Sequence, residues 1–404
     1  MKKTNIRKSI LFKASLALTL LTLTFSFTSC KKQKTKTVKV GLLHSLTGTM
    51  SISEIGVRDA ELLAIKELNA AGGVLDCQIK VIEEDGKSNP RIFAEKTKKL
   101  LEEDKVATIF GCWTSDSRKA VKPILEEDYG LLWYPVQYEG FEASPNIMYM
   151  GAAPNQQVVP AIDFCAKNIG KRMYLLGSDY IFPRTANEII KAQLKNLGGE
   201  CVEEVYVPMH EADFAQIIKD IKKKKPDVII NTLNGNSNQS FFSQLKYSGI
   251  DAEDIPVMSF SVSDSEIKTI GADKLRGHYV AWNYFESTAT AKNTRFVSEY
   301  KKEFGSNKAV GDPEEAAYIA VNLWAAACTR AGSFEVEPVR IAAKGLSCIA
   351  PEGIVTIEGS NQHLNKIIRI GKINELGQIQ ELYASPEAVR PDPYLSTYAW
   401  ARGL

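Results

Sequence analysis

Short apolar segments alternate with amphipathic segments along most of the chain. The apolar run at 38–43 is followed by apolar residues at helical spacing up to Gly72 and Gly73, which end a predicted helix. Further segments predict strands at 78–82, 106–110, 131–134, 146–150, 172–177, 202–207, 226–233, 255–260 and 278–282. Strands that alternate with helices predict parallel, doubly wound sheets and an α/β fold.

The alternation falls into two series, which predicts two lobes with a ligand cleft between them. The second series begins near Asn155, and helix-rich sequence follows it at 294–304 and 313–331. Two later segments, 354–357 and 366–370, suggest a β hairpin. Because this tail must return to both lobes, we expect chain crossings near residues 153, 285 and 355. The expected lobes are an N-terminal lobe of 38–153 plus 286–355 and a C-terminal lobe of 154–285 plus 356–404.

The first 30 residues have the layout of an export signal. A basic cluster precedes an apolar run from Ile10 to Phe27, and small residues lead to Cys30. We therefore expect residues 1–29 to be a signal peptide, Cys30 to be lipidated, and residues 30–37 to form a polar tether. The alternative is an uncleaved membrane helix, for which this run is marginal in length and diluted by Ser and Thr.

Charge and composition narrow the partners. The chain carries +2, and residues 1–29 hold five positive charges and no acids, so +2 less five leaves −3 for the remainder. A mildly acidic body argues against nucleic acid as a partner. The four histidines lack metal-ligand spacing, so we expect no metal site and no cofactor. The six cysteines beyond Cys30 permit disulfides without requiring them.

Common catalytic motifs are missing from the sequence. It contains no GxSxG, GxxxxGK[ST] or HExxH motif. Adjacent acids such as Glu83 and Glu84 are typical of solvated segments. These observations favour a binding protein over an enzyme.

Four segments dense in aromatic and amide groups each follow an apolar strand. They are Gly111–Ser115, Tyr134–Gly140, Gly177–Pro183 and Asn231–Gly235. Ligands of open α/β sheets bind at the carboxyl ends of the strands, so we expect these segments to line one site. The alternative is that their aromatic residues are core side chains of each lobe.

These segments closely resemble those of the urea-binding components of urea ABC importers. That group belongs to the type I periplasmic-binding family, with the receptors for branched-chain amino acids and short-chain amides. The resemblance extends from about Val38 to Tyr394 and includes 151–157 and 389–393. It implies two lobes joined by three crossovers that close over a ligand, and it implies a membrane permease with its ATPases as partners.

The resemblance also separates this chain from the cytoplasmic amide-sensing regulators. Those regulators are similar over the same segments but differ at four positions. They have tyrosine, threonine, proline and valine where this chain has Trp113, Val136, Gln137 and Asn234. A signal peptide also argues against a cytoplasmic sensor.

Urea has one carbonyl acceptor and four N–H donors, and buried polar groups must be paired. We expect the Ser115 hydroxyl and backbone N–H to bind the carbonyl, and we expect Gln137, Asn234, Tyr180 and backbone carbonyls to accept the N–H groups. Trp113, Tyr134 and Phe182 would enclose the site, and Asp179 would either accept an N–H or cap its loop. The full set of expected ligand-binding residues is Trp113, Thr114, Ser115, Tyr134, Gln137, Tyr138, Asp179, Tyr180, Phe182 and Asn234.

The sequence therefore predicts an exported lipoprotein, periplasmic or at the cell surface, that captures urea or a small neutral amide for an ABC importer. The alternatives are a receptor for a short-chain amide or a branched-chain amino acid. An exported amide hydrolase is a further alternative, and it lacks a visible pair of nucleophile and base.

Overall fold

The computed structural model describes residues 36–404. The predicted signal peptide at 1–29, Cys30 and nearly all of the tether at 30–37 lie outside the described residues. Within residues 36–404, no helix combines the length and apolar character that crossing a membrane requires. The six cysteines in this part of the chain are all free thiols.

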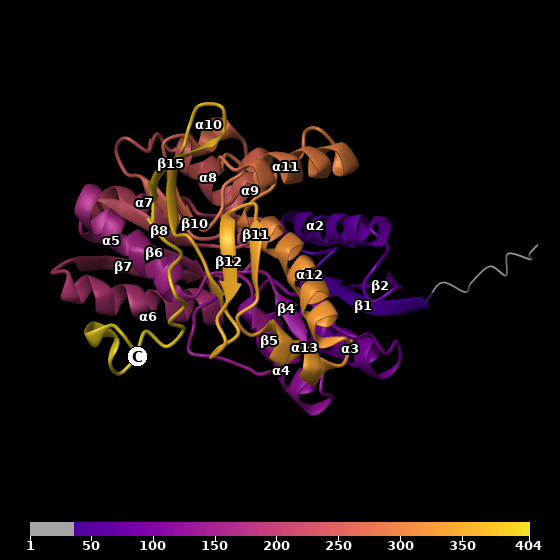
Figure 1. Cartoon of the computed structure of the whole chain (residues 1–404). Coiled ribbons are helices and arrows are strands. Elements are labelled where there is room, and N and C mark those ends of the chain that lie inside the picture. The colour runs from indigo at the N-terminus through magenta and orange to yellow at the C-terminus, as the bar shows by residue number, and fades with distance from the viewer. Residues whose placement is uncertain (1–35) are drawn as a thin grey trace, which may run out of the picture. The chain divides into compact units, whose positions relative to one another are not determined.

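The first sheet has five strands in the order β2-β1-β3-β4-β5 (Figure 1). Its strands are β1 (Lys36–His44), β2 (Cys77–Asp85), β3 (Ile109–Gly111), β4 (Leu132–Tyr134) and β5 (Ile147–Tyr149). β1, β3, β4 and β5 pair in parallel. Every residue of β3, β4 and β5 is buried, as expected for parallel strands covered on both faces.

Local capping explains where the helices of this lobe begin. These helices are α2 (Ser51–Ala70), α3 (Pro90–Glu102) and α4 (Ser115–Glu127). The Asn89 side chain accepts a hydrogen bond from the Arg91 N–H, and Pro90 occupies the first turn of α3, where its missing N–H costs nothing. Thr114 caps α4 by accepting from the Ser117 N–H. The loop after β3 therefore enters α4 in a fixed geometry.

The second sheet has seven strands in the order β15-β14-β10-β9-β8-β6-β7. Its parallel strands are β6 (Arg172–Ser178), β7 (Glu200–Val207), β8 (Val228–Thr232), β9 (Val257–Ser259) and β10 (Tyr279–Trp282). The two antiparallel strands at its edge are β14 (Arg369–Ile373) and β15 (Ile379–Ala384). The sequence did not predict this antiparallel edge.

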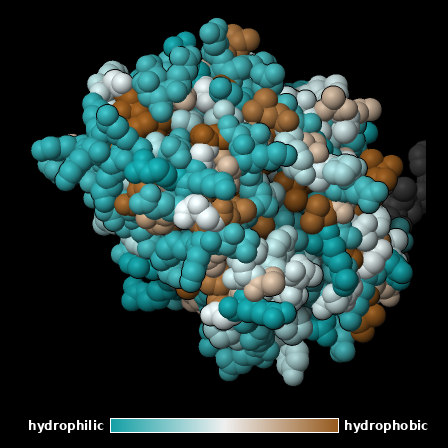
Figure 2. All heavy atoms as spheres, turned by 90° about the vertical axis from the view of Figure 1, so that its left-hand side faces the viewer, coloured by the Kyte–Doolittle hydropathy of each residue, from teal (hydrophilic) through white to brown (hydrophobic). Residues whose placement is uncertain are grey.

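Helices cover both faces of the second sheet. Met173 and Leu175 pack into one core, whereas Tyr174 and Leu176 pack into another, because successive strand residues point to opposite faces. The first core holds residues of α5 (Val158–Asn168) and α6 (Ile181–Asn196), and the second holds residues of α7 (Ala215–Lys224), α8 (Ser237–Tyr247), α9 (Asp264–Ile270) and α10 (Ala272–Leu275). The outer face over this lobe is mostly hydrophilic, with scattered hydrophobic residues (Figure 2). The predicted α/β fold with two doubly wound sheets is confirmed.

The tail returns to the core of the first lobe before it rejoins the second sheet. Its helices are α11 (Ala291–Phe304), α12 (Asp312–Ala331) and α13 (Val336–Ala343), and α12 packs along α2 (Figure 1). A small antiparallel sheet follows, formed by β11 (Ser347–Ala350), β12 (Gly353–Ile357) and β13 (Leu364–Asn365). Two short 3₁₀ helices complete the elements, η1 (Pro154–Gln156) and η2 (Ala399–Ala401).

The predicted hairpin between 354–357 and 366–370 is wrong. β12 pairs with β11 and β13, whereas β14 pairs with β10 and β15. Val355, Ile357 and Leu364 are buried in the core of the first lobe, but Ile370 is buried in the core that holds α5 and α6 in the second lobe. Each apolar segment thus packs into a different core, and the chain crosses between the two sheets after residue 365.

One buried polar cluster ties the three crossing segments together. Asn283 Nδ2 donates to Gln156 O at 3.2 Å and to Ile367 O at 2.9 Å. Lys366 Nζ donates to Met150 O at 3.1 Å and lies 2.9 Å from Glu352 Oε1, with both side chains at most 1% exposed. Burial alone would lower the pKa of Lys366, but Glu352 and neighbouring acids raise it above its usual value. The ammonium group is therefore charged and paired at the point where the lobes join.

We expect Lys366→Met to lower the free energy of unfolding by about 3–5 kcal/mol, because it leaves a buried carboxylate without its cation. Denaturant unfolding measures this loss. Lys66→Met is the matched control, since Lys66 pairs with Glu303 on the surface, and its change should stay within about 1 kcal/mol. Equal losses in the two variants would show that Lys366 is not a special anchor of the crossings.

Candidate functional site

Six of the predicted residues lie at the strand ends where the two lobes contact each other. Trp113 and Ser115 follow β3, Tyr134 ends β4 and Gln137 follows it, Tyr180 follows β6, and Asn234 follows β8. We call this set, Trp113, Ser115, Tyr134, Gln137, Tyr180 and Asn234, the interlobe site. Its side chains are at most 8% exposed, so water has little access to them.

Hydrogen bonds connect the lobes directly at this site. Trp113 Nε1 donates to Asn234 Oδ1 at 3.3 Å. Gln137 Nε2 donates to the Phe260 carbonyl at 2.8 Å and to Ser261 Oγ at 3.1 Å. Close by, the Asp116 carboxylate accepts from the backbone N–H at the start of α6. The segments after β3 and β4 therefore contact those after β6, β8 and β9.

Gln137 presents an unused acceptor. Both hydrogens of its amide nitrogen are directed at the second lobe, whereas Oε1 is buried and has no hydrogen-bond partner among the described residues. An unpaired buried acceptor costs about 1–3 kcal/mol. A ligand that donates a hydrogen bond to this oxygen would remove that cost.

Ser115, Tyr134 and Trp113 have also committed their donors. The Ser115 hydroxyl donates to Glu139, and the Tyr134 hydroxyl donates to the Trp113 carbonyl. Trp113 Nε1 is used by Asn234, as described above. The expected donation from the Ser115 hydroxyl to a ligand carbonyl does not fit this geometry, because its single hydrogen already points to a carboxylate.

A buried ion cluster supports Ser115 from behind. Arg118 is fully buried, with Nη2 2.8 Å from Glu139 Oε1 and Nε 2.8 Å from Glu142 Oε1. Burial disfavours the charged guanidinium, but the two carboxylates raise the pKa of Arg118 well above its usual value. Burial would likewise raise the pKa of Glu142, yet Arg118 and Lys119 lower it to about 2. The guanidinium charge is thus neutralised within the lobe.

Tyr180 supplies the one uncommitted hydroxyl donor of the set. It carries no hydrogen bond from its hydroxyl to another described residue, and it lies near Tyr134 and Glu139. Burial, together with these neighbours, raises the pKa of Tyr180 well above its usual value, so the hydroxyl keeps its proton. Phe182 packs in the second-lobe core with its ring 6.3 Å from that of Tyr180. The aromatic pair shields the site from solvent.

Three other predicted residues have local partners away from the interlobe contacts. Thr114 uses its side chain to cap α4. Tyr138 donates to the Glu142 carbonyl at 2.8 Å inside the first lobe. Asp179 is 49% exposed and pairs with Arg184 at 2.7 Å. The geometry gives these residues structural partners rather than positions in the interlobe site.

Sequence reasoning missed Arg118 and Glu139 as parts of the site. Glu139 lies within the segment that was singled out, and Arg118 lies one helical turn after Ser115. The i, i+3 spacing was a usable signal for Arg118 and Ser115. Their meeting with Glu139 depends on how two separate loops pack, and no spacing in the sequence shows that.

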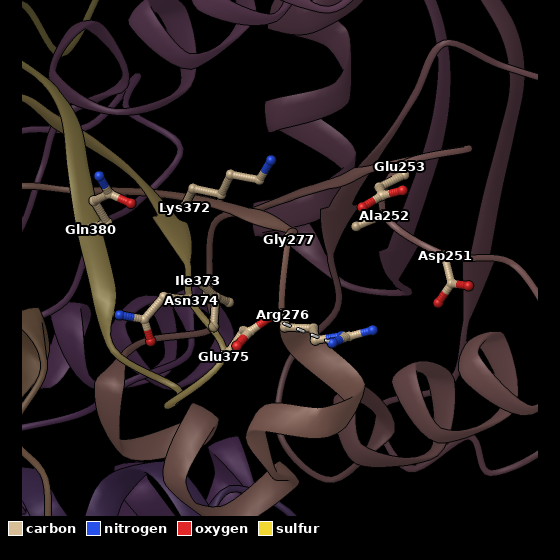
Figure 3. Close-up of a pocket in the computed structure, with 10 residues that line it drawn as sticks. All are labelled: Asp251, Ala252, Glu253, Arg276, Gly277, Lys372, Ile373, Asn374, Glu375 and Gln380. Atoms are coloured by element: carbon tan, nitrogen blue, oxygen red, sulfur yellow. Dashed lines mark ion pairs between the residues drawn. The ribbon is translucent and has the colours of Figure 1, made fainter.

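A surface cavity also lies away from the interlobe site. A cavity of about 380 Å³ opens at the amino ends of β9 and β10, opposite the strand ends that carry the interlobe site (Figure 3). Its lining includes acids and bases, among them an ion pair of 3.9 Å between Arg276 and Glu375. Such mutually compensated surface charges do not select a particular ligand.

Comparison with known proteins identifies the family. The model of the periplasmic binding protein domain matches residues 38–399. The Leu/Ile/Val-binding protein homolog 6 of Brucella melitensis is 22% identical over 346 residues, which cover 83% of this chain and 87% of the relative.

Solved structures agree with this assignment. The solute-binding protein of an ABC transporter from Rhodopseudomonas palustris BisB5, in complex with 3,4-dihydroxybenzoic acid, superposes with a TM-score of 0.80 at 26% identity and covers 88% of this chain and 98% of its own. The branched-chain amino acid transporter substrate-binding protein of Streptococcus pneumoniae, in complex with isoleucine, gives 0.77 at 20% identity and covers 88% and 100%. The chain belongs to the periplasmic binding protein family and is a substrate-binding protein of the ABC-transporter type, not an enzyme.

Proposed function

We propose that this protein captures urea, or another small neutral amide, between its lobes and delivers it to a membrane permease with ATPase subunits. The family implies an exported protein. Lipidation at Cys30 would hold it at the membrane surface, through the signal-like sequence that precedes that cysteine.

The observation that carries this proposal is the imbalance between acceptors and donors in the interlobe site. The donors of Ser115, Tyr134, Gln137 and Trp113 are directed at protein atoms, whereas Gln137 Oε1 is a buried acceptor without a partner among the described residues. The oxygens of Ser115 and Tyr134 keep lone pairs for a ligand. A ligand rich in N–H groups matches such a site, and urea offers four.

The lack of free positive charge favours a neutral ligand. Arg118 is the buried cation nearest to the site, and Glu139 and Glu142 both pair with it. The relatives named above were solved with isoleucine and with 3,4-dihydroxybenzoic acid, and both ligands carry a carboxylate. A buried carboxylate is best compensated by a cation, and the buried cation nearest to the interlobe site is already paired.

The carbonyl oxygen of urea has two suitable partners. The first backbone N–H groups of α4 have no acceptor within the helix, and the positive end of the helix dipole favours an oxygen there. The Tyr180 hydroxyl is a neutral donor on the opposite lobe. A carbonyl held between α4 and Tyr180 would leave both amide nitrogens directed at the acceptors of the first lobe.

Titration calorimetry with urea, acetamide, leucine and 4-hydroxybenzoate tests the proposal. Urea has four heavy atoms, and a ceiling of roughly 1.5 kcal/mol for each gives about 6 kcal/mol, or a dissociation constant on the order of 10⁻⁵ M. We expect Gln137→Ala to weaken urea binding by about tenfold or more, because an N–H group loses its acceptor and the contact between the lobes is cut.

The matched control for Gln137→Ala is Gln193→Ala. Gln193 is also buried, its Nε2 also makes two hydrogen bonds, and its Oε1 also lacks a partner among the described residues. It lies within the second lobe, so its replacement should leave urea affinity unchanged. A parent protein that binds leucine or 4-hydroxybenzoate and not urea would refute the proposed ligand.

Trp113 should set the size limit of the ligand. Trp113→Ala removes the indole that lies between the lobes, so we expect weaker urea binding and a relative gain for propionamide. Trp113→Phe loses the hydrogen bond to Asn234 but keeps most of the bulk, and it should therefore keep the preference for urea. The idea fails if Trp113→Ala leaves the ratio of urea to propionamide affinity unchanged.

Cys30→Ser tests the proposed anchor separately from the ligand. We expect the parent protein to fractionate with membranes and the variant to be released or left uncleaved. Purified soluble Cys30→Ser protein should still bind urea, since the two lobes are formed by residues 36–404. A mature parent protein found only in the soluble fraction would remove the anchor and leave the binding proposal standing.

A further inference from the structure

Four buried side chains form a chain of contacts that ends at the interlobe site. The Ser115 hydroxyl donates to Glu139 and accepts from Arg118 Nη1 at 3.1 Å. Arg118 then joins Glu139 to Glu142 through its other nitrogens, each at 2.8 Å. The four residues are at most 5% exposed.

We propose that Glu139 is a positioning residue that fixes the Ser115 hydroxyl as a hydrogen-bond acceptor, so that the site prefers ligands with two amide nitrogens to ligands with one. This inference rests on the proposed function and deepens it, because it names the feature of the ligand that is read. Arg118 can only donate hydrogen bonds. The hydroxyl hydrogen of Ser115 therefore has Glu139 as its acceptor within the cluster. Since the Ser115 oxygen also accepts from Arg118, it keeps one lone pair for a ligand.

Two acceptors from neighbouring strand ends then face the ligand on the side of the first lobe. Ser115 follows β3 and Gln137 follows β4, and these two strands pair in parallel. Urea can donate to both, one amide nitrogen to each. Acetamide replaces one nitrogen by a methyl group, so it leaves one of the two acceptors unpaired. The preference for urea over acetamide should thus depend on Ser115 remaining an acceptor.

Glu139→Gln should reverse the polarity of Ser115. The guanidinium of Arg118 accepts nothing, so the new amide must turn its oxygen towards Arg118 and its nitrogen towards Ser115. That nitrogen then donates to the Ser115 oxygen, and the hydroxyl hydrogen is released towards the ligand. One acceptor of the site has become a donor, while the size of the side chain is unchanged.

Urea and acetamide dissociation constants of the parent, Glu139→Gln and Glu142→Gln, measured by titration calorimetry, test this inference. We expect Glu139→Gln to reduce the preference for urea over acetamide by about tenfold. Glu142→Gln is the matched control, because it removes the same charge from the same guanidinium without touching Ser115. A general loss of structure would weaken both ligands alike and leave the ratio unchanged.

A double-mutant cycle with Ser115→Ala separates a direct effect of Glu139 from one through Ser115. In the Ser115→Ala background, Glu139→Gln should leave the ratio unchanged. If Glu139→Gln does not fold, as judged by its thermal unfolding, Glu139→Asp keeps the charge and withdraws the carboxylate, and the ratio should fall by a smaller factor. An unchanged ratio in the folded variant, or an equal shift in both backgrounds, overturns the inference. A parent that binds no urea overturns the proposed function instead.

Discussion

The buried guanidinium of Arg118 is the interaction on which the binding end of the first lobe depends. Taking a cation out of water costs several kcal/mol unless it is paired and hydrogen-bonded. Arg118 meets this requirement because Glu139 and Glu142, in the loop after β4, pair with it at the first turn of α4. The loops after β3 and β4 are therefore held in one arrangement. This arrangement positions Ser115, Tyr134 and Gln137.

The same requirement decides what the site can recognise. Arg118 and Lys119 together balance the charges of Glu139 and Glu142, so the cluster presents no unpaired cation. The hydroxyl of Ser115 is turned towards the Glu139 carboxylate. Structures with this fold hold ligands as different as isoleucine and 3,4-dihydroxybenzoic acid, so the scaffold itself does not set the ligand. The side chains at the strand ends do.

The fold was largely predictable from the sequence, because hydrophobic periodicity reports burial directly. Met173 to Leu176 alternate between two cores, and β3 to β5 are buried throughout, as a doubly wound sheet requires. The true strand pairing in the tail was not predictable, since both predicted segments are apolar and the sequence does not say which core each one fills. Val355 and Ile370 lie in different cores for that reason.

The location of the interlobe-site side chains at the strand ends was predictable, whereas the direction of their hydrogen bonds was not. Residue type and position after a strand placed Trp113, Tyr134 and Gln137 at the right edge of the sheet. Whether a hydroxyl donates or accepts depends on its partner, and the partner of Ser115 comes from another loop. The Ser115 hydroxyl could either donate or accept a hydrogen bond, and the buried Glu139 carboxylate fixes the direction in which it donates. The atoms behind the contact residues thereby set the polarity of the interlobe site as much as the contact residues themselves.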